Sequence, residues 1–139
     1  DTSSSDAVYM LDWYASGIGK VPTKVATTYQ NISDAWSLLI DQKWHDRITA
    51  IKVSDGGLSY VEFFEYRKNK MSIPLFNIYC ATGSNREYYA ERTDLIQLGQ
   101  TTQAIYFAKL TNEGEQSELA LTGDEIKARF SLVNQAWNN

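Results

Sequence analysis

The residues best suited to acid–base chemistry gather around the one histidine of the chain, in the run Trp44-His45-Asp46-Arg47. Acyl transfer by a serine or cysteine nucleophile generally requires a positioned base, most often histidine. His45 and Asp46 are adjacent, so their side chains point apart in a strand and do not face one another on a helix. We therefore interpret this run as a surface turn. A lone histidine also lacks the cysteines or well-spaced carboxylates of a zinc site, and we predict no bound metal.

Paired carboxylates are the other arrangement that could catalyse a reaction, as they do in glycosidases. Glu62 and Glu65 fall on opposite faces of one predicted strand, so they cannot flank the same bond. Glu87 and Glu91 share a face of a predicted short helix, which we interpret as solvated. An acidic stretch further on lacks the alternating ligands and glycine of a calcium loop; it contains Glu113, Glu115, Glu118, Asp124 and Glu125. We predict that the chain is not an enzyme and needs no cofactor.

Composition narrows the possible partners. The chain has 139 residues with a net charge of −4, which argues against a nucleic-acid binder because such proteins need a basic stripe. The basic run Arg67, Lys68 and Lys70 is typical of a solvated hairpin tip. The one cysteine, Cys80, excludes an intramolecular disulfide, and its apolar strand predicts a buried side chain.

The first residues bear on location. Residues 1–6 read DTSSSD, which is typical of a tether left when a signal peptide or lipid-anchor segment is removed. No apolar run approaches the ~18–20 residues that cross a membrane. We therefore expect an extracytoplasmic protein, either secreted or anchored as a lipoprotein. The triplet Asn31-Ile32-Ser33 has the composition of a glycosylation sequon.

Aromatic residues suggest how such a protein would bind. The chain has 4 Trp, 9 Tyr and 5 Phe, and the excess of tyrosine over phenylalanine favours rings with one polar edge. Four of these aromatics lie outside the strongest core patterns and are the predicted partner-binding residues: Trp13, Tyr14, Tyr88 and Tyr89.

The elements that must position these residues form one α+β domain, predicted over residues 7–139. Residues 48–53 and 58–66 make a hairpin around Asp55-Gly56-Gly57, because these residues supply the positive φ angles of a tight turn. A second hairpin joins residues 95–99 and 104–110. Pro74 is predicted to start a strand, where its missing N–H is tolerated.

Two segments permit more than one interpretation. Residues 7–16 are apolar without clean alternation, and predict either a strand or a short helix. Residues 34–40 predict either a helix or a short buried strand, which periodicity does not separate. Gly17-Ile18-Gly19 is expected to be a turn, and residues 112–117 an acidic loop.

Helices are predicted where capping-box spacing occurs. Ser84 and Glu87 have that spacing before a short helix at residues 85–92. Thr122 and Glu125 repeat it before a closing helix at residues 124–137. The closing helix carries one apolar stripe: Ile126, Phe130, Val133 and Trp137.

The pattern resembles the Mog1/PsbP-like domains, a family that includes small exported bacterial lipoproteins. Three segments carry the resemblance: residues 36–40 with Trp44, residues 58–63 and residues 126–132. Shorter similarities to exported Gram-positive domains lie at residues 75–78, 98–99 and 105–107. The resemblance spans residues 34–133, with Asp41 where such proteins usually have proline.

The resemblance implies an antiparallel sheet of about five to six strands flanked by helices, and a strand at residues 36–40. It also implies a cell-envelope or extracellular setting and a role in binding or assembly, with no catalytic residues to carry over. We predict a non-enzymatic binding module with a protein partner. The alternative is an inhibitor or immunity-type protein that blocks a secreted enzyme.

Overall fold

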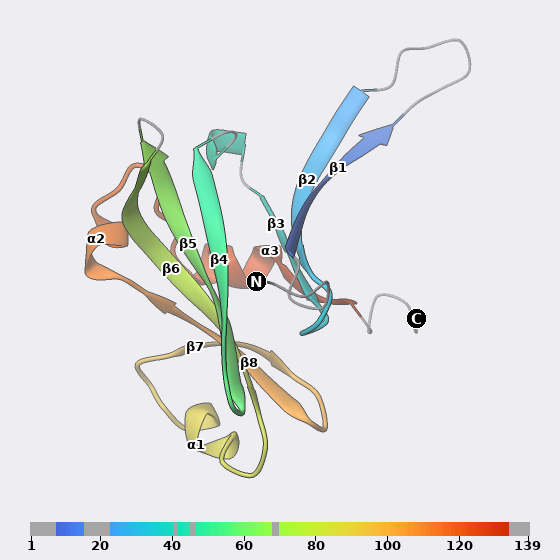
Figure 1. Ribbon diagram of the computed structural model, residues 1–139, viewed down its shortest axis with the longest axis vertical. Coiled ribbons are helices and arrows are strands. Elements are labelled where there is room, and N and C mark those ends of the chain that lie inside the picture. Colours follow the sequence, from blue (N-terminus) through green and yellow to red (C-terminus); the bar gives the residue numbers. More distant parts are fainter. Residues whose placement is uncertain (1–7, 16–22, 41, 45–46, 68–69, 134–139) are drawn as a thin grey trace. The chain divides into compact units, whose positions relative to one another are not determined.

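The computed structural model describes residues 8–15, 23–40, 42–44, 47–67 and 70–133, with side chains from residue 27 onward in most of these ranges. Its strands and helices confirm an α+β fold with antiparallel sheets (Figure 1). The chain forms two compact units. We call residues 1–42 with 129–139 the terminal unit, and residues 43–128 the central unit. The single sheet expected from the sequence is replaced by one sheet in each unit.

The terminal unit is built on a four-stranded antiparallel sheet in the order β1-β2-β3-β9. Its strands are β1 (Val8–Ala15), β2 (Thr23–Asn31), β3 (Trp36–Leu39) and β9 (Phe130–Leu132). Both ambiguous segments are therefore strands. Trp36 is fully buried, with its ring centroid 5.7 Å from that of Tyr29 and 5.8 Å from that of Phe130. Contact of buried Trp36 with buried Tyr29 and half-buried Phe130 favours a strand at residues 36–39, because the sheet brings Phe130 beside them.

The turn between β2 and β3 is fixed by the side chain of Asn31, which is fully buried. Its Oδ1 accepts hydrogen bonds from Ser33 Oγ and from the Asp34 backbone N–H, each at 3.1 Å. Ala35 closes the turn with φ +62°, in the left-handed region that residues with a Cβ seldom adopt. Because the Asn31 amide is engaged inside the fold, the sequon composition of residues 31–33 reflects turn chemistry.

The central unit is built on a five-stranded antiparallel sheet in the order β4-β5-β6-β8-β7. Its strands are β4 (Ile48–Asp55), β5 (Leu58–Arg67), β6 (Lys70–Thr82), β7 (Ile96–Gln100) and β8 (Ala104–Leu110). Both predicted hairpins are confirmed. Gly56 has φ +61° in the β4–β5 turn, and a Cβ on Gly57 would lie 2.8 Å from the Thr82 carbonyl oxygen. The turn therefore requires both glycines.

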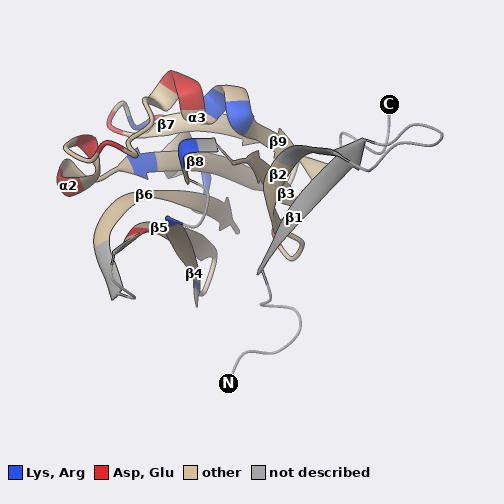
Figure 2. Cartoon of the chain, turned by 90° about the horizontal axis from the view of Figure 1, so that it is seen from above, with Lys and Arg blue, Asp and Glu red and all other residues tan. Residues whose placement is uncertain are grey.

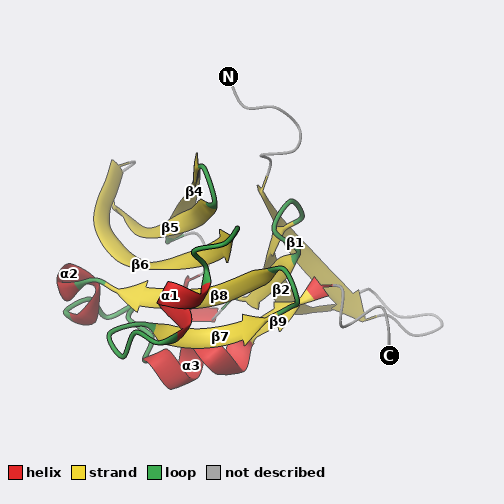
Figure 3. Ribbon diagram, turned by 90° about the horizontal axis from the view of Figure 1, so that it is seen from below, coloured by secondary structure: helices red, strands yellow, loops and turns green. Residues whose placement is uncertain are grey.

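One face of this sheet forms the main core of the central unit. Val61, Phe63 and Ile78 are fully buried there, and Trp44 from the 3-10 helix η2 (Gln42–Trp44) lies 5.7 Å from Phe76 between ring centroids. Helix α3 (Gly123–Arg129) runs along the sheet beside β7 and β8 (Figure 3). The lack of a side chain at Gly123 permits this approach, because a Cβ there would lie 2.9 Å from the Ile96 side chain.

The closing helix is shorter than the predicted residues 124–137. It ends at Arg129, and residues 130–132 form strand β9, whose Phe130 pairs with Leu38 and whose Leu132 pairs with Trp36. The helical stripe prediction was wrong at Phe130, because sheet pairing overrides helical periodicity there. Trp137, the last predicted member of the stripe, lies outside the described residues. The predicted start of the helix was correct: Thr122 N–H donates to Glu125 Oε1 at 2.8 Å, and Glu125 N–H to Thr122 Oγ1 at 3.1 Å.

Three smaller predictions also need correction. Helix α1 covers only Glu87–Ala90, and its N-cap Arg86 makes no side-chain capping bond, so the box predicted at Ser84 does not form. Pro74 lies inside β6, at an irregularity in the pairing with β5 where its missing N–H is tolerated.

The predicted acidic loop contains a short helix, α2 (Asn112–Glu115). Thr111 caps it, since its Oγ1 accepts from the Gly114 N–H at 2.7 Å. Gly114 packs so closely on β6 that a Cβ would clash with the Leu75 carbonyl oxygen. The sequence signal for this helix was the cap at Thr111, which the acidic composition obscured.

Candidate partner-binding site

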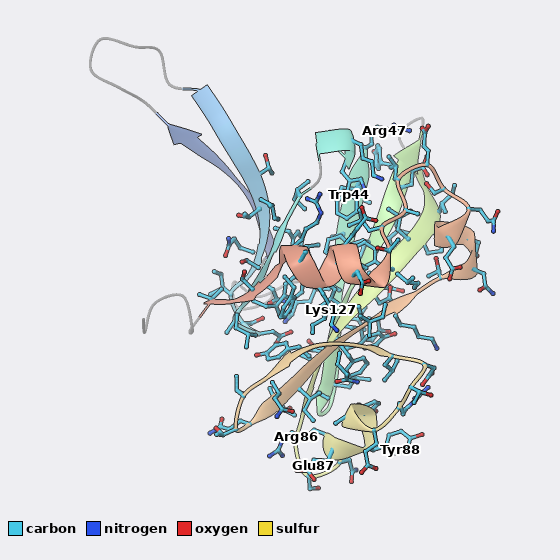
Figure 4. All side chains as sticks on the ribbon, turned by 180° about the vertical axis from the view of Figure 1, so that it is seen from behind. Trp44, Arg47, Arg86, Glu87, Tyr88 and Lys127 are labelled. Atoms are coloured by element: carbon cyan, nitrogen blue, oxygen red, sulfur yellow. The ribbon has the colours of Figure 1, made fainter. Side chains whose placement is uncertain are left out.

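Tyr88 on α1 is the most exposed large hydrophobic residue among those the structure describes, at 64% of its accessible surface (Figure 4). The segment that carries it is fastened to the sheet. Arg86 donates from Nη1 to the Gly83 carbonyl at 2.7 Å and from Nη2 to the Thr102 carbonyl at 3.1 Å. The second bond reaches the β7–β8 loop, so α1 is tied to a neighbouring hairpin as well as to its own chain.

The Tyr88 ring has two defined neighbours. The Tyr89 ring meets it in a T-shaped contact with centroids 5.3 Å apart and planes at 77°. The guanidinium carbon of Arg92 lies 5.7 Å from the Tyr88 centroid, within the range of a cation–π interaction. We call Tyr88, Tyr89 and Arg92 the α1 aromatic site.

Asp94 holds Arg92 in place. Arg92 Nε donates to Asp94 Oδ1 at 2.9 Å, and Arg92 Nη2 donates to Asp94 Oδ2 to complete a bidentate ion pair. The hydrogen bond from Arg92 lowers the pKa of the Asp94 carboxyl, so the ion pair persists through the neutral pH range. The planar fork restricts the guanidinium beside Tyr88.

A row of stacked rings supports the site from below. Tyr89 stacks on buried Phe107 with centroids 5.1 Å apart, and Phe107 stacks on Tyr79 at 4.9 Å. The row continues to Tyr60 at 4.9 Å from Tyr79. It therefore crosses β8, β6 and β5 on the face opposite the main core. Gln97 Nε2 also donates to the Tyr89 carbonyl at 2.9 Å, which fixes the backbone of α1 to β7.

The four predicted partner-binding residues fall into two pairs. Tyr88 and Tyr89 lie together on α1 of the central unit. Trp13 and Tyr14 are consecutive positions of β1 in the terminal unit, with a register irregularity between them. Their side chains lie outside the described residues. Sequence reasoning missed Arg92 as a member of the site, although its spacing of four residues from Tyr88 on a predicted helix was the signal.

The prediction that Glu62 and Glu65 lie on opposite faces of one strand is confirmed. Glu65 is fully buried on the core face beside Phe63, whereas Glu62 lies on the other face. Glu65 accepts a hydrogen bond from Ser117 Oγ at 2.6 Å, so it takes part in the internal structure. The sequence signal for this burial is the alternation of Glu65 with Val61 and Phe63 along the strand. Glu87 and Glu91 are exposed, as predicted.

Several other predicted features have a defined outcome. Cys80 is buried at 5% exposure, as expected. In the β5–β6 hairpin, Arg67 lies opposite Lys70 in the backbone pairing of the two strands. The described residues do not include His45, Lys68 or residues 16–22. Acidic side chains gather on α2 and at the start of α3 (Figure 2).

Within the described ranges, no three His, Cys, Asp or Glu side chains are grouped as metal ligands. In the same ranges, no helix has the length and hydropathy to cross a membrane. Comparison with known protein families, curated proteins and solved structures finds no match to this chain.

Proposed function

We propose that this protein is a non-enzymatic binding or assembly module that contacts a protein partner through the α1 aromatic site. The observation that supports this most is the combination at Tyr88 of 64% exposure with a fixed environment. Tyrosine gives large amphipathic contact area at low cost in conformational entropy, and tyrosine and arginine are enriched among residues that dominate binding energies. A ring already held by Tyr89 and Arg92 loses little freedom on binding.

Each member of the site has a distinct part in this proposal. Tyr88 supplies the apolar contact area and a phenol that donates or accepts a hydrogen bond. Arg92 lies over the Tyr88 ring and supplies donors to a partner carboxylate or carbonyl at the rim. Tyr89 is half-buried and transmits the support of the Phe107 stack.

We propose a Mog1/PsbP-like relationship and an extracytoplasmic setting on the resemblance alone. The antiparallel sheets and the strand at residues 36–39 are compatible with that resemblance. An experimental structure that superimposes on a member of the family over residues 34–133 would support it. The inhibitor alternative stays a prediction, tested by whether a captured partner is an enzyme that the chain inactivates.

Site-specific photo-cross-linking tests the proposed function. A photoreactive phenylalanine is placed at position 88, with position 66 as the matched control because Tyr66 is also exposed, at 39%. Both variants are irradiated in an extract of the source organism. We expect a discrete cross-linked protein from position 88 that is absent from position 66, and we expect affinity-tagged Tyr88→Ala to retain less of that protein than the tagged wild type in a pull-down without cross-linking.

Circular dichroism and thermal unfolding would first establish that Tyr88→Ala keeps the native fold, because a ring so exposed contributes little packing. Identical cross-linked products from both positions, or undiminished capture by folded Tyr88→Ala, would rule out the α1 aromatic site as the contact surface.

A further inference from the structure

Strand β4 occupies one end of the five-stranded sheet and has β5 as its single neighbour among the described strands (Figure 3). Its pairing with β5 runs without a register shift from Ile48 to Asp55. Edge strands present a row of backbone N–H and C=O groups, which proteins usually protect with proline, bulges, short strands or charged side chains. In β4 there is neither proline nor bulge, and Lys52 is the one charge before the terminal Asp55.

The other edge of the same sheet is protected. Strand β7 is shorter and carries a register irregularity between Gln97 and Gly99. A bulge of this kind twists an edge away from regular pairing. The two ends of the sheet therefore differ, and β4 is the edge suited to accept a further strand.

The side chains of β4 favour such pairing. Thr49, Ile51 and Val53 alternate along the strand and therefore share one face. All three are β-branched, the class that packs best across paired strands. Ile51, in the middle, is 36% exposed and is among the few large apolar side chains that the described residues leave open to solvent.

We propose that β4 pairs antiparallel with β4 of a second copy of this chain, about a two-fold axis at Ile51. In an antiparallel pairing that continues the sheet, directly opposite residues lie on the same face of the sheet. A two-fold axis that relates the two strands therefore passes between the two copies of one residue. Most of β4 can pair only if the axis lies near the middle of the strand, at Ile51 or at Lys52. Centring on Lys52 sets two like charges directly opposite, which is destabilising.

Centring on Ile51 removes that conflict. Lys52 then lies opposite Ala50 of the second copy, and Thr49 lies opposite Val53. The small Ala50 side chain leaves room for the long lysine, and the β-branched residues form a continuous cross-strand row. Each copy uses its single β4 edge, so the contact closes as a dimer and does not propagate.

Disulfide trapping tests this register. In Ile51→Cys the two introduced thiols face one another across the axis. In Ser54→Cys each thiol is displaced by three residues from the axis, so the two lie ~20 Å apart at about 3.4 Å per residue. A disulfide requires Cα atoms within about 7 Å. Native Cys80 is buried and stays in place in both variants.

Under mild oxidation we expect a covalent dimer from Ile51→Cys and a monomer from Ser54→Cys on a non-reducing gel. Equal cross-linking of both variants, or of neither, would overturn the proposed register.

Sedimentation velocity over a wide concentration range tests the dimer without introduced thiols. We expect the wild type to shift from monomer to dimer as concentration rises, and Ile51→Lys to remain monomeric. Tyr66→Lys is the matched control, since it places the same charge on another exposed residue of the sheet and leaves the edge of β4 intact.

The proposal is overturned if the wild type stays monomeric or if Ile51→Lys, folded by circular dichroism, dimerises as well as the control. Tyr88→Ala should dimerise normally, because the α1 aromatic site is separate from β4. The dimer and the proposed function can therefore fail independently.

Discussion

Ala35 is a residue whose backbone conformation opposes its side chain. Its φ of +62° places the Cβ in a conformation that costs about 1–2 kcal/mol for an L-residue. Glycine adopts this conformation freely but adds disorder to the unfolded chain, at about 0.4–1 kcal/mol. We expect Ala35→Gly to raise the free energy of unfolding by about 0.5–1 kcal/mol, measured by urea denaturation. The control is Ala128→Gly, at an exposed position of helix α3, which should lower the free energy of unfolding by about 1 kcal/mol. Destabilisation by both variants would contradict strain at Ala35.

Tyr29 gives a prediction about alkaline stability. Burial raises the pKa of its phenol above the ordinary value of about 10. The unfolded chain therefore releases this proton at lower pH than the folded chain does. The stability from the neutral phenol is complete below about pH 10 and is lost as the pH rises further.

Above pH 10 we expect the free energy of unfolding of Tyr29→Phe to fall less steeply with pH than that of the wild type. The difference in slope is as much as about 1.4 kcal/mol per pH unit, measured by urea denaturation at a series of pH values. An alkaline slope equal to that of the wild type would contradict the assignment.

At the scale of elements, the two capping-box spacings differ in outcome and give a matched pair of variants. Thr122 and Glu125 exchange both bonds of the box at the start of α3, whereas no side-chain cap forms before α1. We expect Thr122→Ala to lower the free energy of unfolding by about 1 kcal/mol and Ser84→Ala to change it by less than about 0.5 kcal/mol. Thermal unfolding of both variants measures this, and equal losses would show that the two bonds between Thr122 and Glu125 do not account for the stability of the α3 cap.

Local signals predicted the elements that local chemistry decides. The Asp55-Gly56-Gly57 turn, the Thr122 cap and the strand around Cys80 all depend on neighbours in sequence. Long-range pairing decides the rest. Residues 130–132 leave the helical stripe because β3 pairs with them, and the sequence of that segment does not contain its partner. Strand β2 was not predicted for the same reason, since its polar residues become a strand through pairing with β1 and β3.

The candidate site was predictable in part. Tyr88 and Tyr89 were identified as outside the core patterns, and Tyr88 is indeed exposed. The stack of Tyr89 on Phe107 joins residues 18 apart in the sequence, and no periodicity relates them. Arg92 belongs to the site through its contact with Tyr88 and its ion pair with Asp94, and the sequence reveals neither of these contacts. Sequence alone thus indicated the exposed Tyr88, but it placed Tyr89 outside the core although Tyr89 is half-buried and packs against a buried cluster that includes Phe107.

At the scale of the whole molecule, the central unit is inserted in the sequence between β3 and β9. Hydrogen bonds connect the first residues of this unit to residues 119–120, close to its last residue. Trp44 Nε1 donates to the Leu119 carbonyl at 2.7 Å, and Lys43 Nζ donates to the Ala120 carbonyl at 3.1 Å. Leu119 is buried, and its N–H in turn donates to Ser117 Oγ at 3.0 Å. This network brings together the start and the final third of the unit.

Trp44→Phe tests whether the two compact units are also separate units of stability. The change leaves the buried Leu119 carbonyl without its indole donor, at a cost of about 1–3 kcal/mol, and reduces packing against Phe76. We expect amide hydrogen exchange to accelerate in β5 and β6 and to stay unchanged in β2 and β3. Ala35→Gly should show the converse, with slower exchange confined to β2 and β3. If either variant moves exchange in both sheets equally, the two units unfold as one cooperative structure.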